Sequence, residues 1–205
     1  TFNDHRAWPF KLPEEVHPTR WTGDTAVNFI ETYNEPQPFF LKVSFARPHS
    51  PYDPPQRIWD MYDGVDLPKA NVGAWAGKYA ALSDYAPDYW HGDLGAEQVR
   101  VSRRGYYGAV TFIDEQIGRI LASLEKRRML ENTLIIYISD HGDMTGDHNL
   151  WRKSYAYEPS AKVPLLVRWP GGTLSEKRGA TIDNPVEIRD MLPTMLDAAG
   201  DTEQR

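Results

Sequence analysis

The sequence predicts an α/β domain in which a layered sheet carries helices on both faces. Three short stretches have the length, apolar character and β-branched residues of buried strands: 39–45, 132–138 and 162–169. Two longer stretches have the spacing of amphipathic helices: 95–127 and 185–200. Strands that alternate with helices along the chain are typical of layered α/β sheets. We therefore expect residues 1–205 to form a single α/β domain.

Length and composition exclude several classes of protein. The chain has 205 residues, enough to bury a core, and its 40% hydrophobic and 25% charged residues are ordinary for a globular domain. A net charge of −6 argues against a general surface for nucleic acid or anionic membranes. The absence of cysteine excludes a disulfide framework and a zinc-thiolate site. No apolar run approaches the ~20 residues that a membrane span needs.

The first helix is predicted after a polar, proline-bearing arm of residues 1–20. Residues 22–25 include side chains that cap helices, so the helix should begin after them. It should run through residues 26–33, where one apolar face recurs at helical spacing: Ala26, Phe29, Ile30 and Tyr33.

His49 is a candidate catalytic residue because of its place after a predicted strand. Residues 39–45 predict a strand that is buried on both sides, and the chain then enters a loop with four prolines: Pro48, Pro51, Pro54 and Pro55. Prolines stiffen a loop, and a catalytic imidazole must be held in position to be useful. The alternative is a surface histidine in an irregular loop.

Residues 53–95 are rich in proline, glycine, aspartate and aromatic residues, with little periodicity. A stretch of this length without regular structure is uncommon inside a compact domain and is usually functional. We therefore expect a lid or a specificity insertion. A partly ordered connection is the alternative.

The clearest helix pattern extends from Gly95 to Arg127. Its predicted apolar face recurs at spacings of three and four residues: Val99, Ser102, Tyr106, Val110, Ile113, Ile117, Ile120, Leu121 and Leu124. Basic residues at its end suit the negative pole of a helix. Asp114 and Glu115 fall in mid-helix, and we expect them on the solvated face.

The stretch after the 132–138 strand carries most of the predicted chemistry. Asp140 and His141 are its first strongly polar residues, and ligands of open α/β sheets bind beyond the carboxyl ends of the strands. A carboxylate and an imidazole can hold a divalent cation, and Lys153 can hold an anion beside it. This combination indicates half of an ester-hydrolysis site. The alternative is a strand end followed by a polar turn.

The last elements complete the alternation of strands and helices. Residues 155–160 predict a short helical turn. The strand at 162–169 should end at Pro170-Gly171-Gly172, and the helix at 185–200 has Gly200 just past its end.

Five motifs, taken together and in this order, resemble landmarks of the type I sulfatases of the alkaline phosphatase superfamily. They span residues 38 to 200 and include Pro48-His49-Ser50-Pro51, Ser139-Asp140-His141-Gly142, Gly146-Asp147-His148 through Lys153, Val163-Pro164-Leu165, and Asp190-Met191-Leu192-Pro193-Thr194. The resemblance implies an alkaline phosphatase-like fold, of which this chain holds part. It also implies the hydrolysis of sulfate esters, with an aryl sulfate, another sulfated small molecule or a sulfated glycan as the substrate.

The resemblance assigns expected roles to five residues. Asp140 and His141 match the metal-side pair, which implies Ca²⁺ or Mg²⁺ as the cofactor. Lys153 matches the lysine that contacts the sulfate and its bridging oxygen. His49 matches the histidine that helps to bind the sulfate and protonates the leaving group. His148 lies where related enzymes contact the substrate.

One part of the family pattern is missing. The nucleophile of the family is a formylglycine made from a Cys/Ser-x-Pro/Ala-x-Arg signature, and the sequence contains no such signature. The paired N-terminal aspartates of the metal site are also missing. We therefore expect the chain to be the C-terminal part of a sulfatase domain, to need the N-terminal half as its partner, and to be inactive alone. The compartment stays undetermined, although the resemblance suggests a periplasmic or secreted protein.

Two alternatives remain open. A phosphonate or phosphate ester hydrolase of the same superfamily shares the Asp140-His141 strand end and the loop that carries His148. Two-zinc phosphodiesterases of that superfamily need a further histidine downstream, and His148 is the last histidine of this chain. The alternative from another class is a non-catalytic fragment that keeps some affinity for anions or metals.

Overall fold

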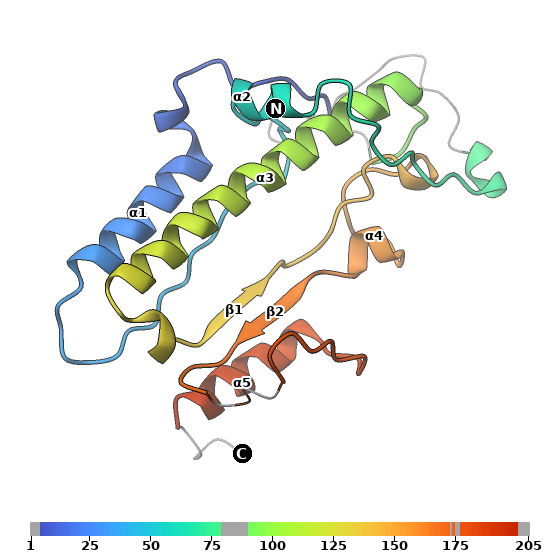
Figure 1. Cartoon of the computed structure of the whole chain (residues 1–205). Helices are drawn as coiled ribbons and strands as arrows, with labels where there is room; N and C mark the ends of the chain where they lie inside the picture. The colour runs from blue at the N-terminus through green and yellow to red at the C-terminus, as the bar shows by residue number, and fades with distance from the viewer. Residues whose placement is uncertain (1–4, 79–89, 173, 175–176, 201–205) are drawn as a thin grey trace.

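A computed structural model describes residues 5–78, 90–172, 174 and 177–200 of the chain, and shows helices packed around a two-stranded sheet (Figure 1). The α-helices are α1 (Pro18–Thr32), α2 (Gln56–Met61), α3 (Ala96–Lys126), α4 (Glu158–Ala161) and α5 (Met191–Ala198). The strands are β1 (Ile135–Ile138) and β2 (Leu165–Arg168). Short 3₁₀ turns at Glu14–Val16, Ala74–Lys78, Leu130–Asn132, Asp147–Asn149 and Ile188–Asp190 connect them.

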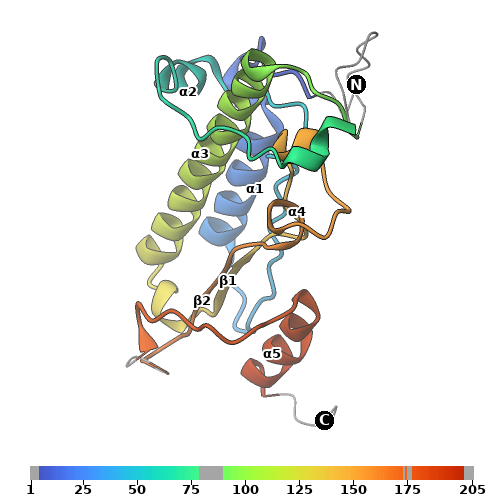
Figure 2. The ribbon, with the colours of Figure 1, turned by 90° about the vertical axis from the view of Figure 1, so that its right-hand side faces the viewer.

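The sheet pairs β1 with β2 in antiparallel fashion, with Ile135 opposite Arg168 and Ile138 opposite Leu165. Figures 1 and 2 show both strands between the pair α1 and α3 on one side and α5 on the other. The predicted strands at 132–138 and 162–169 and the predicted α/β layering are therefore present, with each strand shortened to four residues.

Helix α1 begins earlier than the capping pattern predicted. It starts at Pro18, inside the stretch expected to be an arm, because Pro18 suits the first position of a helix. The cap is the buried His17, whose Nδ1 accepts the backbone N–H of Thr19 at 3.0 Å. Histidine is not among the usual capping residues, so the sequence pattern missed this start.

Helix α3 has nearly the predicted bounds, and the predicted face is confirmed in part, because Ser102, Ile113 and Leu124 are buried. Val110, predicted to face the core, is 38% exposed, whereas Phe112 is fully buried and Gln116 is 2% exposed. Glycines explain the difference, because they allow close approach of the backbone. A Cβ at Gly105 would lie 2.7 Å from the carbonyl oxygen of Tyr52. A search for large apolar residues at helical spacing cannot detect a contact made by glycine.

The predicted strand at 39–45 is wrong in this structure, which assigns no strand there. Burial nevertheless alternates along it, with Phe39, Leu41, Val43 and Phe45 more covered than the residues between them. Phe39 packs its ring on Phe29 of α1 at 5.4 Å. In the described part of the chain no backbone hydrogen bond joins this segment to another strand, and a strand exists only through such pairing.

The described residues of the long stretch 53–95 include regular structure. It contains α2 and the 3₁₀ turn Ala74–Lys78, while residues 79–89 of the predicted lid lie outside the described residues. Asn71 and Gly73 from this stretch bond to Asp147 and His148. Among the described helices, none combines the length and the apolar character that crossing a bilayer requires.

Candidate active site at the end of β1

His49 and Lys153 are 104 residues apart in the sequence and meet in the fold, where Nζ of Lys153 lies 3.0 Å from Nε2 of His49. Nδ1 of His49 lies 3.0 Å from the carbonyl oxygen of Ser50. A carbonyl only accepts, so this contact assigns the ring proton to Nδ1. Nε2 is left with a lone pair, which accepts the hydrogen bond that the Lys153 ammonium donates. Both contacts fix the orientation of the imidazole.

Asp140 and His141 follow β1 directly and form the second pair. Nδ1 of His141 donates to the carbonyl of Gly142 at 2.7 Å, which leaves a lone pair on Nε2. Nε2 lies 3.8 Å from Oδ2 of Asp140, whose side chain is 88% exposed. A histidine that binds a metal commonly donates its other ring N–H to a backbone carbonyl, so His141 is oriented as such a ligand would be.

The two pairs adjoin each other. The rings of His49 and His141 pack edge to face, with centroids 6.2 Å apart. The structure thus brings together Asp140, His141, His49 and Lys153, from three separate segments, beyond the carboxyl end of β1. The cluster offers the Asp140 carboxylate, the lone pair of His141, and the Lys153 ammonium held by His49. Such a set can contribute ligands to a cation and donors to a neighbouring tetrahedral anion.

The donors present suit a divalent cation only in part. Asp140 supplies a hard oxygen and His141 a nitrogen, whereas Ca²⁺ takes six to eight ligands, mostly oxygens. Among the residues that the structure describes, no group of three or more His, Asp or Glu side chains could hold a metal ion.

Asp143 fixes the loop between the two pairs. Its Oδ1 accepts the backbone N–H groups of Thr145 at 2.9 Å and Arg152 at 3.1 Å, so it spans the base of the loop. Its Oδ2 accepts the hydroxyl of Tyr52 at 3.0 Å. Because Tyr52 lies three residues after His49, this bond ties the His49 loop to the Lys153 loop.

Tyr52 stays a neutral donor in this position. Its side chain is fully buried, and burial together with the charge of Asp143 raises its pKa well above the ordinary value of 10.0. Burial, followed by the charge of the same aspartate, raises the pKa of the neighbouring Tyr106 to about 12. Both phenols near the Asp143 carboxylate are therefore neutral at pH 7.

A buried ion pair holds the far side of the loop. Nη2 of Arg103, from α3, lies 2.5 Å from Oδ1 of Asp147, and both side chains are less than 10% exposed. The loop also holds five non-glycine residues in the left-handed region of φ: Thr145, His148, Asn149, Arg152 and Ser154. Such conformations persist only where the surroundings impose them, and they concentrate at functional sites.

His148 faces a different set of groups from His49 and Lys153. Its ring Nδ1 accepts the backbone N–H of Gly73 at 3.0 Å, and the backbone N–H of His148 donates to the carbonyl of Asn71 at 2.7 Å. Its ring packs 4.9 Å from the rings of both Trp75 and Tyr157. The predicted substrate contact thus lies on a wall built partly by the 53–95 stretch.

The sequence reasoning missed the residues that position the site. Asp143 carried a usable signal, because an aspartate two residues before Thr145 is typical of a side-chain turn. Tyr52 and Arg103 carried none. Their roles depend on contacts across 91 and 44 residues, which no local pattern encodes.

Comparison with known proteins identifies similar sequences over nearly the whole chain. The sequence model of the sulfatase family matches residues 9–201. The chain is 41% identical over 200 residues to an arylsulfatase of Clostridium perfringens, which covers 96% of this chain and 42% of that protein. It is 36% identical over 173 residues to a choline-sulfatase of Rhizobium meliloti, a match that covers 80% of this chain and 32% of that protein. The chain therefore spans less than half the length of these relatives.

A solved structure has the same fold. The phosphonate monoester hydrolase of Agrobacterium radiobacter superposes with a TM-score of 0.81 at 25% sequence identity. The likeness covers 98% of this chain and 42% of that one. The partial α/β domain therefore has the architecture that the sequence predicted.

Proposed function

The chain belongs to the sulfatase family of the alkaline phosphatase superfamily, and from this membership we propose that it is part of an enzyme that hydrolyses sulfate esters. One observation supports the proposal most directly. The Lys153 ammonium and the His49 imidazole contact each other beside the carboxylate of Asp140 and the ring of His141. Hydrolysis of a sulfate ester builds negative charge on the sulfuryl and leaving oxygens, and this cluster is suited to hold that charge.

Lys153 is proposed to bind the sulfate group and its bridging oxygen. In the structure its ammonium donates to Nε2 of His49, so its position is fixed before the substrate arrives. A donor that is already oriented costs no reorganisation when charge develops on the ester.

His49 is proposed to protonate the leaving oxygen. Its Nδ1–H is held by the carbonyl of Ser50, so a second proton can only be carried at Nε2. A proton at Nε2 replaces the hydrogen bond that Lys153 donates there, so both cationic groups would then donate to the anionic ester. The imidazolium can then release this proton to the departing alkoxide.

Asp140 and His141 are proposed to hold Ca²⁺, or Mg²⁺ in its place. The bound ion would polarise a sulfuryl oxygen and neutralise charge on the anion. Asp140 is the stronger candidate ligand, because hard cations prefer carboxylate oxygen over imidazole nitrogen. The lone pair at Nε2 of His141 faces the same carboxylate.

The remaining machinery is proposed to lie in a segment of the same protein outside residues 1–205, which would include a formylglycine nucleophile. Three observations support this. The sequence has no cysteine, and no serine in the Ser-x-Pro/Ala-x-Arg pattern. The segment 39–45 alternates in burial without a strand partner in the described chain. The related arylsulfatase is more than twice as long as the matched region. On this proposal the 205-residue chain is inactive alone.

Hydrolysis of a phosphonate or phosphate ester is the second candidate, favoured by the fold shared with a phosphonate monoester hydrolase. The cluster serves either tetrahedral anion, so relative activity must separate them. The complete protein should turn over 4-nitrophenyl sulfate faster than phenyl phosphonate esters. The reverse order would favour the second candidate, and no turnover of either would favour a non-catalytic binding fragment.

The variant Lys153→Ala tests the charge-stabilising role. We expect kcat on 4-nitrophenyl sulfate to fall by ~10²–10³, the usual effect of removing one preorganised donor. Asp140→Ala should abolish activity and weaken metal binding. Lys11→Ala and Asp114→Ala are matched controls, because both side chains are exposed and remote in sequence from the cluster. Full activity in Lys153→Ala would contradict the assignment.

A further inference from the structure

The loop that carries His49 is closed at its base by an ion pair. Nε of Arg47 donates to Oδ1 of Asp53 at 2.6 Å, and Nη2 of Arg47 donates to Oδ2 at 3.0 Å. The two residues flank His49 in the sequence and are six positions apart. Two parallel bonds between a guanidinium and a carboxylate fix the orientation of both groups as well as their separation. The ion pair therefore sets how the two ends of the loop meet.

The end of the loop formed by Tyr52 and Asp53 is anchored in the core. Both residues are buried, and the carbonyl of Tyr52 accepts the backbone N–H of Trp8 at 3.3 Å. The buried His17 accepts a backbone N–H of α1 at Nδ1, so its Nε2 carries the proton and donates to the carbonyl of Asp53 at 3.1 Å. These contacts fix this anchored end without any help from His49.

The other end of the loop has no such backbone anchor among the described residues. It follows the segment 39–45, which no backbone hydrogen bond joins to another part of the described chain. The backbone N–H of His49 donates to the carbonyl of Ala46 at 3.2 Å, a contact within the turn itself. The side chain of Arg47 is 12% exposed, and its ion pair joins this end to the anchored end. The position of His49 therefore depends on Arg47.

Asp53 keeps its charge although it is buried. Burial raises the pKa of its carboxyl, but the neighbouring His17 and Arg47 outweigh that effect, so this pKa lies below the ordinary value of 3.8. The carboxylate is therefore ionised at pH 7 and balances the charge of Arg47. Neither group is well hydrated, and a buried charge that loses its partner is strongly unfavourable. Each member of the pair thus holds the other in place.

His49 needs this support because its contact with Lys153 has a direction. Nε2 of the imidazole must face the Lys153 ammonium, which lies 3.0 Å away. The anchored end is already tied to the loop of Lys153, because the hydroxyl of Tyr52 donates to Asp143 at 3.0 Å. The same anchor therefore positions Lys153 through Tyr52 and His49 through Arg47.

Resting on the proposed function, we propose that Arg47 and Asp53 are positioning residues, which hold the His49 imidazole where it can pass a proton to the leaving oxygen. Neither side chain contacts the reacting ester on this proposal, because each uses its polar atoms for the other. A misplacement of ~1 Å in an active site can cost on the order of 10²-fold in rate. Loss of the pair should therefore reduce proton donation much more than it reduces sulfate binding.

The test uses two aryl sulfates of similar size on the complete protein. The leaving group of 4-nitrophenyl sulfate departs without a proton, whereas that of 4-methoxyphenyl sulfate needs one. In Arg47→Gln, kcat on the methoxy ester should fall about tenfold or more, with KM and the rate on the nitro ester changed less than about threefold. Arg47→Lys keeps the charge but lacks the two-bond geometry, so its loss should be intermediate.

Further variants separate positioning from a general loss of stability. Combined with His49→Ala, the change Arg47→Gln should not alter the ratio of the two kcat values any further. Asp53→Asn keeps the carbonyl that His17 contacts, should reproduce the effect of Arg47→Gln, and covers the case in which that variant does not fold. Arg168→Gln is the matched control, because it removes an ion pair with a glutamate beside the first residue of β1, and it should leave the ratio unchanged.

A second readout does not depend on turnover. NMR of the ring nitrogens in isotope-labelled protein reports the tautomer of each histidine, and the signal that disappears in His49→Ala belongs to His49. The neutral ring should carry its proton on Nδ1 in the wild type. In Arg47→Gln the signal should move toward the Nε2–H form that a free neutral imidazole prefers, because Lys153 no longer donates to Nε2.

The outcomes distinguish the two proposals. Equal losses on both esters in Arg47→Gln, the result expected if Arg47 contacted the sulfate, would overturn the positioning role. A further change of the ratio in the double variant, or an unchanged His49 tautomer, would overturn it as well. Absence of sulfate ester turnover in the wild type overturns the sulfatase proposal, and the tautomer of His49 then decides by itself whether the ion pair holds the ring.

Discussion

The position of one proton defines how His49 can act. With Nδ1–H bound to the Ser50 carbonyl and Nε2 accepting from Lys153, the residue is an acceptor until an anion arrives. In the proposed role as a general acid, it would have to carry its second proton at Nε2. Its role should therefore depend on the substrate and, in particular, on how much the leaving oxygen needs a proton.

The variant His49→Ala tests this dependence. Sulfate esters of poorly acidic alcohols, such as hexose sulfates, should lose ~10²–10⁴ in kcat/KM, the usual range for a general acid. 4-Nitrophenyl sulfate should lose much less, because its leaving group departs without a proton. Both rates are measured on one preparation, so each substrate is the control for the other. Equal losses on both would remove the general-acid role.

Tyr52 and Asp143 are proposed to position the site residues rather than to contact the substrate. The phenol ties the loop after His49 to the loop before Lys153, and it is buried and neutral. The folded state holds this phenol protonated well above pH 10.0, whereas an unfolded tyrosine ionises near ~10. Its stabilising effect is thus fully present below ~10 and is lost as the pH rises toward its folded pKa.

Removal of the Tyr52 hydroxyl should reveal both its contribution to stability and the pH dependence of that contribution. Tyr52→Phe should lower the free energy of unfolding by ~1.5–3 kcal/mol at pH 7, as expected for a lost bond to a charged acceptor. The difference from the wild type should shrink in urea titrations repeated above pH ~10, where unfolded Tyr52 ionises. A difference that does not change with pH would contradict the raised pKa.

At the scale of elements, α3 organises the packing. It contacts α1 and α2. Near the isolated β-bridge that pairs Ala7 with Tyr52, the helix packs through Gly105 rather than through a large side chain. Gly105 lies where a Cβ would meet the side chain of Ala7 at 2.5 Å and the carbonyl oxygen of Tyr52 at 2.7 Å. Gly118, in the same helix, has no atom within 4 Å of its added Cβ among the described residues.

These two glycines form a matched pair for substitution. Gly105→Ala should destabilise the protein by ~1–3 kcal/mol, because backbone must move to admit the methyl group. Gly118→Ala should stabilise it by ~0.5–1 kcal/mol, because alanine loses less backbone entropy in a helix. Urea denaturation of both variants measures the difference. Similar effects at both positions would mean that α3 packs less closely here than the contacts indicate.

At the scale of the whole molecule, the described sheet has two strands, and the segment 39–45 has no strand partner among the described residues. β1 pairs only with β2 among the described strands, and the segment 39–45 runs between α3 and β1 in Figure 1. Phe40, in that segment, is 77% exposed. Extended backbone without a strand partner is a template on which a further strand can pair, and such a strand could also cover the exposed ring of Phe40.

Hydrogen exchange on the complete protein tests this interpretation. The backbone amides of residues 39–45 should exchange slowly there, because a strand from outside residues 1–205 would pair with them. The amides of residues 181–184, which are exposed and have no assigned helix or strand, provide the fast-exchanging comparison. Exchange at 39–45 as fast as at 181–184 would show that the segment stays unpaired and would weaken the case for a sheet completed by the rest of the protein.

Local sequence patterns determined much of this fold. The spacing of apolar residues located α3, β1, β2 and α5, and the polar residues after β1 marked Asp140, His141 and Lys153 as candidates. These features depend on neighbours within one or two turns of chain, so the sequence encodes them directly. The pattern at 39–45 failed because a strand also needs a partner, and a partner is not a local property.

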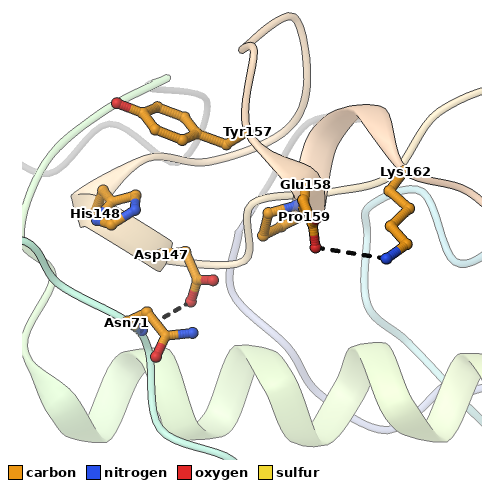
Figure 3. A pocket seen from close by; sticks show the side chains of 7 residues that line it. All are labelled: Asn71, Asp147, His148, Tyr157, Glu158, Pro159 and Lys162. Carbon is orange, nitrogen blue, oxygen red and sulfur yellow. Dashed lines mark hydrogen bonds and ion pairs between the residues drawn. The ribbon is translucent and has the colours of Figure 1, made fainter.

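Only the tertiary structure decided how the candidate residues are arranged. It set Nζ of Lys153 at 3.0 Å from Nε2 of His49 and assigned the ring protons of His49 and His148 through backbone contacts. It placed His148 at a cavity to which Asn71 of the 53–95 stretch contributes (Figure 3). It also revealed Tyr52, Asp143 and Arg103, which hold the loops in place. Each of these results depends on contacts between distant segments. Composition and periodicity describe each segment by itself, whereas the chemistry arises where the segments meet.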